Sequence, residues 1–280
     1  MAFHMEYFRS SLSSGVTNVL QQVTFVFSGV LAASGNAMQV SNSLTKLHSL
    51  AGFGTTLENI SPQAPSMLPL AYPNLASNNV GSAMNTPMAV WDFSRNPKPL
   101  RPTEPFSIFA SQTSAGAETE TVFVQFTDGL VQPAPALAVG PALNGNGMLT
   151  TVHATAATTL TANTFTAVTP ILDSPGLPAG YYALVGARVM SAHAIAFRMA
   201  PQNEPLWRPG GWAVQAATDL DYPGQRYINN LTGAISHWGV WLNFYQNTVP
   251  GVLIFSTAAD TVENMWFDVI KISDGVTGGI

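Results

Sequence analysis

Residues able to carry out acid–base or metal chemistry are few and scattered along the chain. The histidines, His4, His48, His153, His193 and His237, form no His-x-x-x-His spacing, and the chain has no cysteine. Metal sites in proteins need several such ligands at short or convergent spacings. We therefore interpret the histidines as core or surface residues, and we expect no bound metal and no cofactor.

Two short patterns resemble known sites, and each has a simpler interpretation. Ser43 and Lys46 match the letters Ser-x-x-Lys, but the companion Ser-Asp-Asn and Lys-Thr-Gly motifs of that enzyme class are absent. Asp219 and Asp221 place two carboxylates close together, which falls short of the roughly six oxygens that a hard cation takes, so we expect a solvated loop. The chain also lacks Gly-x-Ser-x-Gly and phosphate-loop motifs. We therefore expect no catalytic residue and no enzymatic activity.

An aromatic pair marks a candidate contact surface. Trp207 and Trp212 flank Arg208 and a Pro-Gly-Gly turn, which predicts a tight loop. Tryptophan and arginine are frequent anchors of protein contacts, and an aromatic pair also suits a sugar ring. We expect Trp207, Arg208 and Trp212 to contact another subunit, with sugar binding as the alternative.

The composition restricts the classes of partner. Of 280 residues only 9% are charged, and the formal net charge is −5. An average soluble protein has about 25% charged residues. The few basic residues form no patch that could neutralise phosphates, so we expect no direct contact with nucleic acid. A surface this poor in charge is either covered by partners or relies on small polar residues.

The segment 1–22 has apolar residues at spacings near four. Phe3, Tyr7 or Phe8, Leu12 and Val16 follow this spacing, which predicts a short amphipathic helix. Such a helix packs on its own domain, or it docks onto a membrane or a neighbouring subunit. In the docking interpretation, Phe3, Tyr7 and Phe8 are the contact residues. No run of about 18 apolar residues predicts a membrane-spanning helix.

The rest of the chain is organised around a repeat. Segment 106–129 aligns without a gap on segment 252–275, since 254 − 108 and 274 − 128 both give 146. Each copy has a short apolar run, a polar connection, an alternating run and a closing Asp-Gly turn. This pattern predicts two neighbouring antiparallel strands in each half.

The repeat and the proline distribution predict two similar domains. Segment 133–147 combines prolines with Gly and Asn turns, which is typical of a stiff connector. The predicted domains are 23–132 and 148–280, each with several short strands and no strand–helix alternation. The long Pro- and Asn-rich segment 61–87 is predicted as a loop that carries contacts. The predicted fold is all-β, with two tandem eight-stranded antiparallel jelly rolls and a short N-terminal helix.

With this architecture the chain resembles the double jelly-roll major capsid proteins of tailless, membrane-containing icosahedral bacteriophages. The resemblance covers the whole chain and depends most on the repeat of 106–129 and 252–275. It implies a structural protein of the virion that forms homotrimers with a pseudo-hexagonal outline. It also implies contacts with neighbouring capsomers and vertex proteins, and with an internal membrane through the N-terminal segment. That family has no catalytic residues that could be transferred to this sequence.

A recognition module is the alternative. A tandem β-sandwich lectin, or a phage spike or fibre head, would bind glycans through loops such as 61–87 and 207–212. A capsid subunit is expected to assemble, whereas a lectin is expected to stay soluble and bind sugars.

Overall fold

The structure is a computed structural model of the whole chain. It describes residues 3–13, 17, 19–26, 31–54, 56–67, 89–93, 96–129, 146–200, 208–215, 240–246, 248–261 and 264–274. The chain divides into two compact units, Met1–Leu130 and Val131–Ile280. Within the described residues both units consist of β-strands, together with one 3-10 turn, η1 (Pro65–Met67). The chain is therefore all-β.

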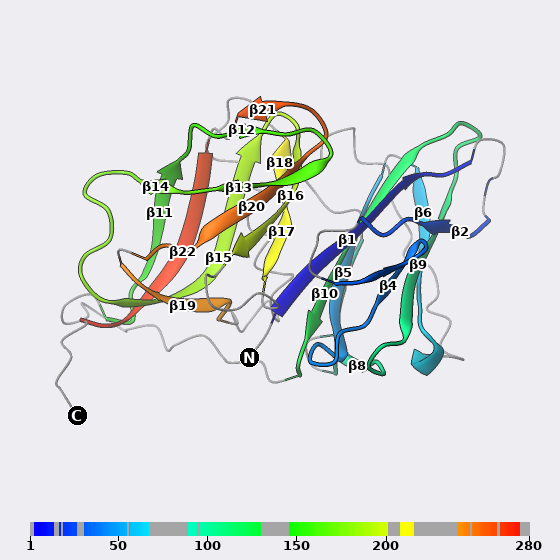
Figure 1. The fold of residues 1–280 in the computed structure, drawn as a ribbon, viewed down its shortest axis with the longest axis horizontal. Coiled ribbons are helices and arrows are strands. Elements are labelled where there is room, and N and C mark those ends of the chain that lie inside the picture. Colours follow the sequence, from blue (N-terminus) through cyan, green and yellow to red (C-terminus); the bar gives the residue numbers. More distant parts are fainter. Residues whose placement is uncertain are drawn as a thin grey trace. The chain divides into compact units, whose positions relative to one another are not determined.

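The first unit contains two antiparallel sheets (Figure 1). The first sheet consists, in order, of β1 (Phe3–Ser11), β10 (Thr119–Thr127), β5 (Lys46–Phe53) and β7 (Ala89–Asp92), with β8 (Lys98–Pro99) also paired to β5. The second consists of β2 (Gln21–Val23), β9 (Pro105–Gln112), β4 (Ala37–Gln39) and β3 (Ala33–Ser34), with β6 (Leu57–Gln63) also paired to β9.

Aromatic side chains from both sheets meet in the core of the first unit. The ring centroid of Phe106 on β9 lies 5.3 Å from that of Phe126 on β10 and 6.0 Å from that of Phe8 on β1. Since Phe106 belongs to one sheet and its two partners to the other, the sheets pack face to face. All three side chains are fully or almost fully buried, and burial of each contributes about 1.5–3 kcal/mol.

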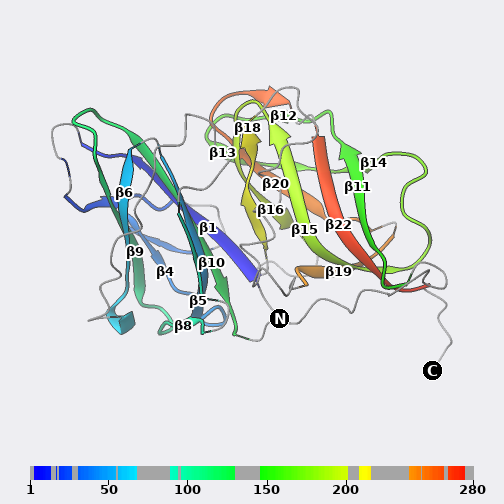
Figure 2. The same cartoon turned by 180° about the vertical axis from the view of Figure 1, so that it is seen from behind.

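The second unit also contains two sheets, which Figure 2 shows from behind. The first consists, in order, of β14 (Ile171–Leu172), β11 (Leu149–Thr155), β22 (Asn264–Ser273), β15 (Tyr181–Ser191) and β18 (Val214–Gln215), with β19 (Leu242–Tyr245) also paired to β15. The second consists of β13 (Thr164–Val168), β20 (Gly251–Ser256), β16 (Ala194–Ala200) and β17 (Gly210–Trp212). A separate short pair joins β12 (Thr159–Leu160) to β21 (Asp260–Thr261). The β15–β18 pair is parallel.

The core of the second unit likewise lies between its sheets. Phe197 on β16 stacks on Trp241, with 6.3 Å between ring centroids. The backbone N–H of Trp241 donates to the carbonyl of Leu184 on β15 at 2.8 Å. Because β15 and β16 belong to different sheets, this stack connects the two layers.

The two units repeat the same strand arrangement. In the first unit β10 lies between β1 and β5, and β9 pairs with both β2 and β6. In the second unit β22 lies between β11 and β15, and β20 between β13 and β16. Ile108 on β9 and Ile254 on β20, which the sequence repeat aligns, therefore lie on corresponding central strands.

The repeated segments are not the neighbouring antiparallel strands that the sequence predicted. The strands β9 and β10 belong to different sheets, and so do β20 and β22. In the first unit, residues 113–118 connect β9 to β10. Packed sheets lie about 10 Å apart, which a short polar connection of this length spans. The alternation predicted both strands, but it did not distinguish a hairpin from a crossing between layers.

The N-terminal segment is a β-strand, and the predicted amphipathic helix is wrong. The strand β1 pairs with β10 along its whole length. Side chains on both faces of β1 are buried, among them Met5, Tyr7 and Phe8. Phe3, Met5 and Tyr7 alternate with His4 and Glu6, as in a strand, but Phe3, Tyr7 or Phe8 and Leu12 also have a spacing near four, which fits a helix. Residues 3–11 are therefore part of the first sheet and not a separate segment.

Two predicted loops lie largely outside the described residues. Of the connector 133–147, the structure describes only Asn146 and Gly147, which form a turn before β11. Of the predicted loop 61–87, it describes residues 61–67, which form the end of β6 and the turn η1. That part was predicted as loop and is regular structure.

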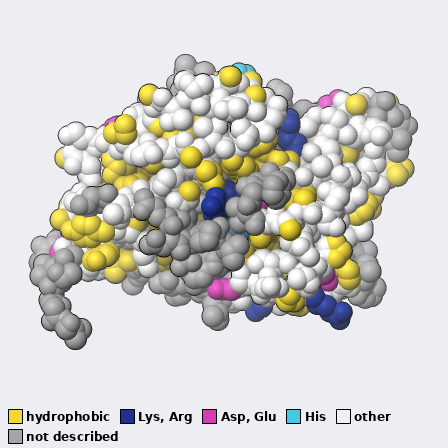
Figure 3. Space-filling view, viewed as in Figure 1, with side chains coloured by type: hydrophobic (Ala, Val, Ile, Leu, Met, Phe, Trp, Pro, Cys, Tyr) yellow, Lys and Arg dark blue, Asp and Glu magenta, His cyan; other side chains and the backbone are white. Residues whose placement is uncertain are grey.

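Charged side chains are sparse on the face of the molecule drawn in Figure 3, where uncharged polar and hydrophobic atoms predominate. Several large hydrophobic side chains are exposed among the described residues, including Val19, Met148, Ile171 and Tyr181. The described part of this face therefore has the neutral character that the composition predicted.

Candidate functional site

Three of the predicted contact residues lie inside the protein. The side chains of Tyr7, Phe8 and Trp212 are fully buried. Tyr7 stacks on Phe123 at 5.8 Å between ring centroids, and Trp212 lies on β17 opposite Ala196 on β16. These residues stabilise the interior, because a side chain without exposed surface cannot reach another subunit. The Pro-Gly-Gly signal before Trp212 predicted a loop where the chain forms a buried strand.

The other three predicted contacts remain predictions. Phe3 is the first residue of β1, but its side chain is outside the described part of the chain, as is all of Trp207. Arg208 is described, and it lies partly exposed just before β17.

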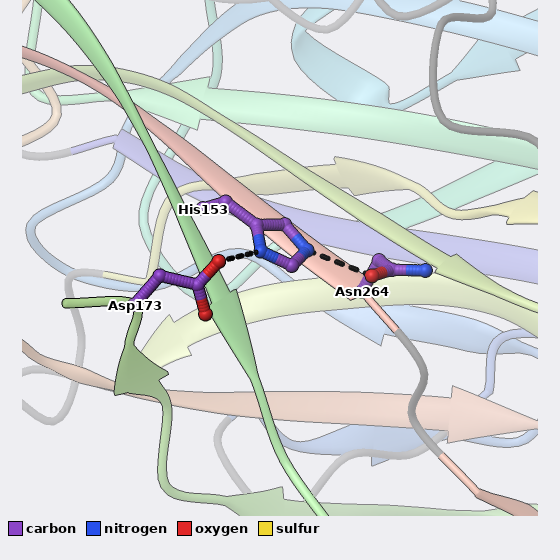
Figure 4. Close-up of polar contacts among 3 residues, drawn as sticks. All are labelled: His153, Asp173 and Asn264. Atoms are coloured by element: carbon purple, nitrogen blue, oxygen red, sulfur yellow. Dashed lines mark hydrogen bonds and ion pairs between the residues drawn. The ribbon is translucent and has the colours of Figure 1, made fainter.

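A cluster of polar side chains lies on the surface of the second unit. His153 on β11 lies between Asp173, which follows β14, and Asn264, the first residue of β22 (Figure 4). Nδ1 of His153 is 2.6 Å from Oδ2 of Asp173, and Nε2 is 2.7 Å from Oδ1 of Asn264. The side chains of His153 and Asp173 are 26% and 57% exposed, so the cluster is open to solvent.

Strand pairing positions this cluster. His153 lies opposite Trp266 in the β11–β22 ladder, and Trp266 lies opposite Arg188 in the β22–β15 ladder. Residues directly opposite each other project from the same face of a sheet. The rings of His153 and Trp266 are accordingly 5.2 Å apart. Their neighbour Phe267 projects from the other face and is almost completely buried.

An ion pair lies next to the cluster on the same face. Nη2 of Arg188 is 2.8 Å from Oδ1 of Asp268, and the Thr151 hydroxyl donates to the same oxygen at 2.5 Å. The side chains of Arg188 and Asp268 are only 17% and 9% exposed. The ion pair and the cluster together connect β11, β22 and β15 through their side chains as well as their backbones.

Both ring nitrogens of His153 are held by hydrogen bonds. Both ring nitrogens face acceptor oxygens, so a doubly protonated ring donates to Asp173 and to Asn264. A neutral ring is equally well satisfied if the Asn264 amide is turned to donate its N–H. In acid–base catalysis an aspartate orients the histidine, whose other nitrogen faces a nucleophile or substrate. Here Asn264 holds that other nitrogen, so the arrangement suits a bridge between strands better than a catalytic base.

Sequence spacing gave no indication of this cluster. Asp173 is 20 residues and Asn264 is 111 residues from His153. The cluster exists because the first long strand of the second unit, β11, pairs with the last, β22. Only the pairing of distant strands brings these side chains together, and the sequence pattern did not predict that pairing.

The other histidines have structural surroundings where they are described. Nε2 of His4 is 2.7 Å from Oε1 of Glu6, and both side chains are fully buried. His48 is also fully buried, and the backbone N–H of His193 donates to Asp260 at 2.9 Å. His237 lies outside the described residues, as do Asp219 and Asp221.

The described residues contain neither a group of metal ligands nor a membrane-spanning helix. No three His, Asp or Glu side chains in that part of the chain come close enough to hold a metal ion. No described helix has the length and apolar character needed to cross a membrane.

Comparisons with known proteins give a distant structural likeness. No known protein family matches the chain, and no curated protein sequence matches it. Among solved structures, the crystal structure of the major capsid protein P2 from Bacteriophage PM2 is similar at 14% sequence identity and a TM-score of 0.26. The match covers 99% of this chain and 100% of that chain. A TM-score of this size is too low to carry a functional argument, so any functional proposal has to rest on the chain itself.

Proposed function

We propose that this chain is a structural subunit of a viral capsid, folded as two tandem jelly rolls. The observation that carries the proposal is the strand order shared by the two units. In each unit the first long strand pairs with the last, and two sheets enclose an apolar core. Jelly rolls have two packed antiparallel sheets and occur in viral capsids and in lectins. Two similar units in one chain favour a capsid, because each chain then supplies two similar domains to a closed assembly.

The proposed assembly is a homotrimer that packs against further trimers. Three chains contribute six similar units, which gives a closed ring an outline close to a hexagon. The charge-poor surface supports this proposal, because neutral surfaces approach each other with little charge repulsion. Neighbouring capsomers and vertex proteins are the proposed partners, and the virion is the proposed location. We do not propose membrane contact through an N-terminal helix, since residues 3–11 form a strand of the sheet.

The proposed function does not include catalysis. The best candidate for an acid–base residue, His153, has both ring nitrogens in hydrogen bonds. Replacing His153 by Ala is expected to change stability only. A hydrolytic activity of the purified chain that disappears in this variant would contradict the proposal.

The direct test is the assembly state of the purified chain. We expect trimers in native mass spectrometry, and hexagonal capsomers, sheets or shells in negative-stain electron micrographs. A chain that remains monomeric at micromolar concentration and forms no ordered assembly would rule out the capsid proposal.

Glycan binding is the second candidate function, and one observation favours it. Trp266 is partly exposed beside His153, Asp173 and Asn264, so an aromatic ring lies next to hydrogen-bonding groups on an open surface. Sugar-binding sites combine such groups. Binding to a glycan array that Trp266→Ala abolishes, by a chain that does not assemble, would favour this function over the capsid.

A further inference from the structure

One face of the second sheet in the first unit points away from the core, and an aromatic ring lies at its centre. On β9, Phe106 and Ile108 are fully buried, and Phe106 contacts Phe126 of the facing sheet. Because successive side chains of a strand point to opposite faces, Phe109 projects away from the core. The side chain of Phe109 is partly exposed. The strand that pairs with β2, β4 and β6 therefore presents an aromatic ring at the surface.

Hydrogen-bonding side chains flank this ring on both neighbouring strands. Gln22 on β2 and Ser61 on β6 lie directly opposite Phe109, so all three project from the same face. Ser107 and Gln63, which lie opposite each other two residues further along the ladder, project from this face as well. We call these five residues the β9 face. Neighbouring strands are about 4.8 Å apart, so a ligand on the phenyl ring is within reach of side chains from all three strands.

The two glutamines of the β9 face are oriented by the sheet and keep further hydrogen-bonding capacity. Nε2 of Gln22 donates to the Ser107 hydroxyl at 3.2 Å, and Nε2 of Gln63 donates to the Ser61 hydroxyl at 3.4 Å. A side-chain amide has two N–H donors and a carbonyl acceptor, so each contact uses only part of the amide. Neither glutamine side chain makes another hydrogen bond within the described residues, and both are partly exposed. Both amides can therefore bind a further polar group.

The second unit provides an internal comparison for the aromatic ring. The sequence repeat aligns Phe109 with Phe255 on β20. Phe165 on the neighbouring strand β13 lies opposite Phe255 and packs on it edge to face, with 5.5 Å between ring centroids. Phe255 is accordingly only 5% exposed. In the first unit the residues opposite the ring are an amide and a hydroxyl, and no described aromatic ring packs on Phe109.

We infer that the β9 face binds a neutral saccharide, which stacks one face of a sugar ring on Phe109 and forms hydrogen bonds with the polar side chains that flank it. Sugars combine C–H groups on the ring faces with hydroxyl groups at the rim, and sites for such ligands combine aromatic surface with a few placed polar groups. This site is separate from the surface at Trp266 in the second unit. The inference does not depend on whether the chain assembles into a capsid.

Charge restricts the class of saccharide. The strands β2, β6 and β9 contain no Lys or Arg, and their one charged residue is the acidic Glu58. Phosphate, sulfate and sialate groups are usually bound by charge-assisted hydrogen bonds from cationic side chains. Because these three strands supply no cation, the β9 face suits uncharged hexoses and N-acetylhexosamines.

The polarity of the β9 face distinguishes a saccharide from a second copy of the chain. The fully buried centre of a contact between protein subunits is apolar and poor in hydrogen-bonding groups. Here the residues on both sides of Phe109, Gln22 and Ser61, are polar. A sugar hydroxyl satisfies these groups, whereas an apolar protein surface would bury them without partners.

A glycan array probed with the full-length chain tests the inference. The probes are neutral hexose and N-acetylhexosamine oligosaccharides, together with sulfated and sialylated forms of the same oligosaccharides. We expect binding to neutral probes and no increase in affinity from added negative charge. Calorimetric titration with the best neutral probe then measures Kd, and Phe109→Ala should weaken binding roughly tenfold through the lost stacking. Failure of every neutral probe to bind, or stronger binding of the charged forms, would overturn the inference.

Three variants locate the binding at the β9 face. Phe165→Ala is the matched control, because it removes a partly exposed ring from the corresponding sheet of the second unit, and it should leave Kd unchanged. Trp266→Ala should also leave Kd unchanged. Gln22→Leu keeps the aromatic ring and removes the amide, so it should weaken binding several-fold. It decides the question if Phe109→Ala does not fold.

Two patterns among the variants would overturn the inference even if the chain binds sugar. If Trp266→Ala abolishes binding and Phe109→Ala does not, the saccharide site lies in the second unit. If Phe109→Ala changes the assembly state in native mass spectrometry but leaves Kd unchanged, the β9 face is a contact between copies of the chain.

Discussion

Replacing Arg188 by Met and Asp268 by Leu, singly and together, tests how the second unit stabilises charge on its sheet. An exposed ion pair contributes about 0–1 kcal/mol, whereas removing one partner of a buried pair costs about 3–5 kcal/mol. Here Nη2 and Oδ1 are 2.8 Å apart and the side chains are 17% and 9% exposed. The pair is thus close to the buried limit, and its residual exposure lowers the expected cost of each single substitution to about 2–3 kcal/mol.

The double variant should be less destabilised than the sum of the two single variants. Replacing both charges with apolar side chains of similar volume leaves no isolated charge on the sheet, so little of the penalty persists. We expect a coupling energy of about 2 kcal/mol from the double-mutant cycle. Urea unfolding followed by tryptophan fluorescence near neutral pH measures it. Asp173→Asn is the matched control, because Asp173 is 57% exposed and its loss should cost less than about 1 kcal/mol.

Two results would refute this reasoning. If the single substitutions add up to the double one within about 0.5 kcal/mol, the charges do not stabilise each other. If the coupling disappears in high salt, the pair behaves as an exposed one, since nearly buried pairs are screened much less. In either case Asp268 would be stabilised mainly by its hydrogen bond from the Thr151 hydroxyl and not by Arg188.

Three further substitutions address carboxyl groups. Glu120→Gln should raise the free energy of unfolding by up to about 3 kcal/mol above pH 7 and by almost nothing near pH 4. The reason is that the pKa of Glu120 is raised from 4.5 to about 7, so its ionisation disfavours the folded state as pH rises. Equal effects at both pH values would exclude this cause. Asp260→Asn should lower the free energy of unfolding by about 1.5–3 kcal/mol at neutral pH and by progressively less below pH 3.8. Burial alone would raise the pKa of Asp260, but hydrogen bonds from Ser191 and from backbone N–H groups outweigh it and lower the pKa. A loss of stability that persists in strong acid would contradict this prediction. Glu104→Ala should lower stability by about 2–3 kcal/mol in thermal unfolding, because it removes the acceptor for the backbone N–H groups of Ser66 and Arg101; an unchanged melting temperature would refute the prediction.

The sequence predicted the strands of the repeat from local apolar runs. The run of Val122, Val124 and Phe126 identified β10, which is buried on both faces, and a similar run identified β22. The pattern failed at β1, where the apolar spacing also fits a helix, and at Trp212, where turn residues precede a buried strand. Local patterns indicate local burial, but they do not show which strands pair or to which sheet a strand belongs.

The polar cluster and the buried carboxyl group were beyond prediction for a different reason. His153 meets Asn264 only because β11 pairs with β22, and Glu120 meets Thr56 only because a connection crosses between the sheets. Each contact joins positions far apart in the chain. Sequence periodicity carries no information about such contacts until strand order and register are known.

The repeat predicts corresponding strands in the two units, but it does not predict equivalent side chains at the aligned positions. The shift of 146 pairs Glu120 with Trp266, yet Glu120 is fully buried and Trp266 is partly exposed. Trp266 lies on the face of His153, and its neighbour Phe267 on the other face is buried, so the shift of 146 aligns a core-facing residue of β10 with an outward-facing residue of β22. Equivalent strands therefore present different side chains to the core. Tryptophan has no titratable group, so the pH dependence expected from Glu120 has no counterpart at the aligned position of the second unit.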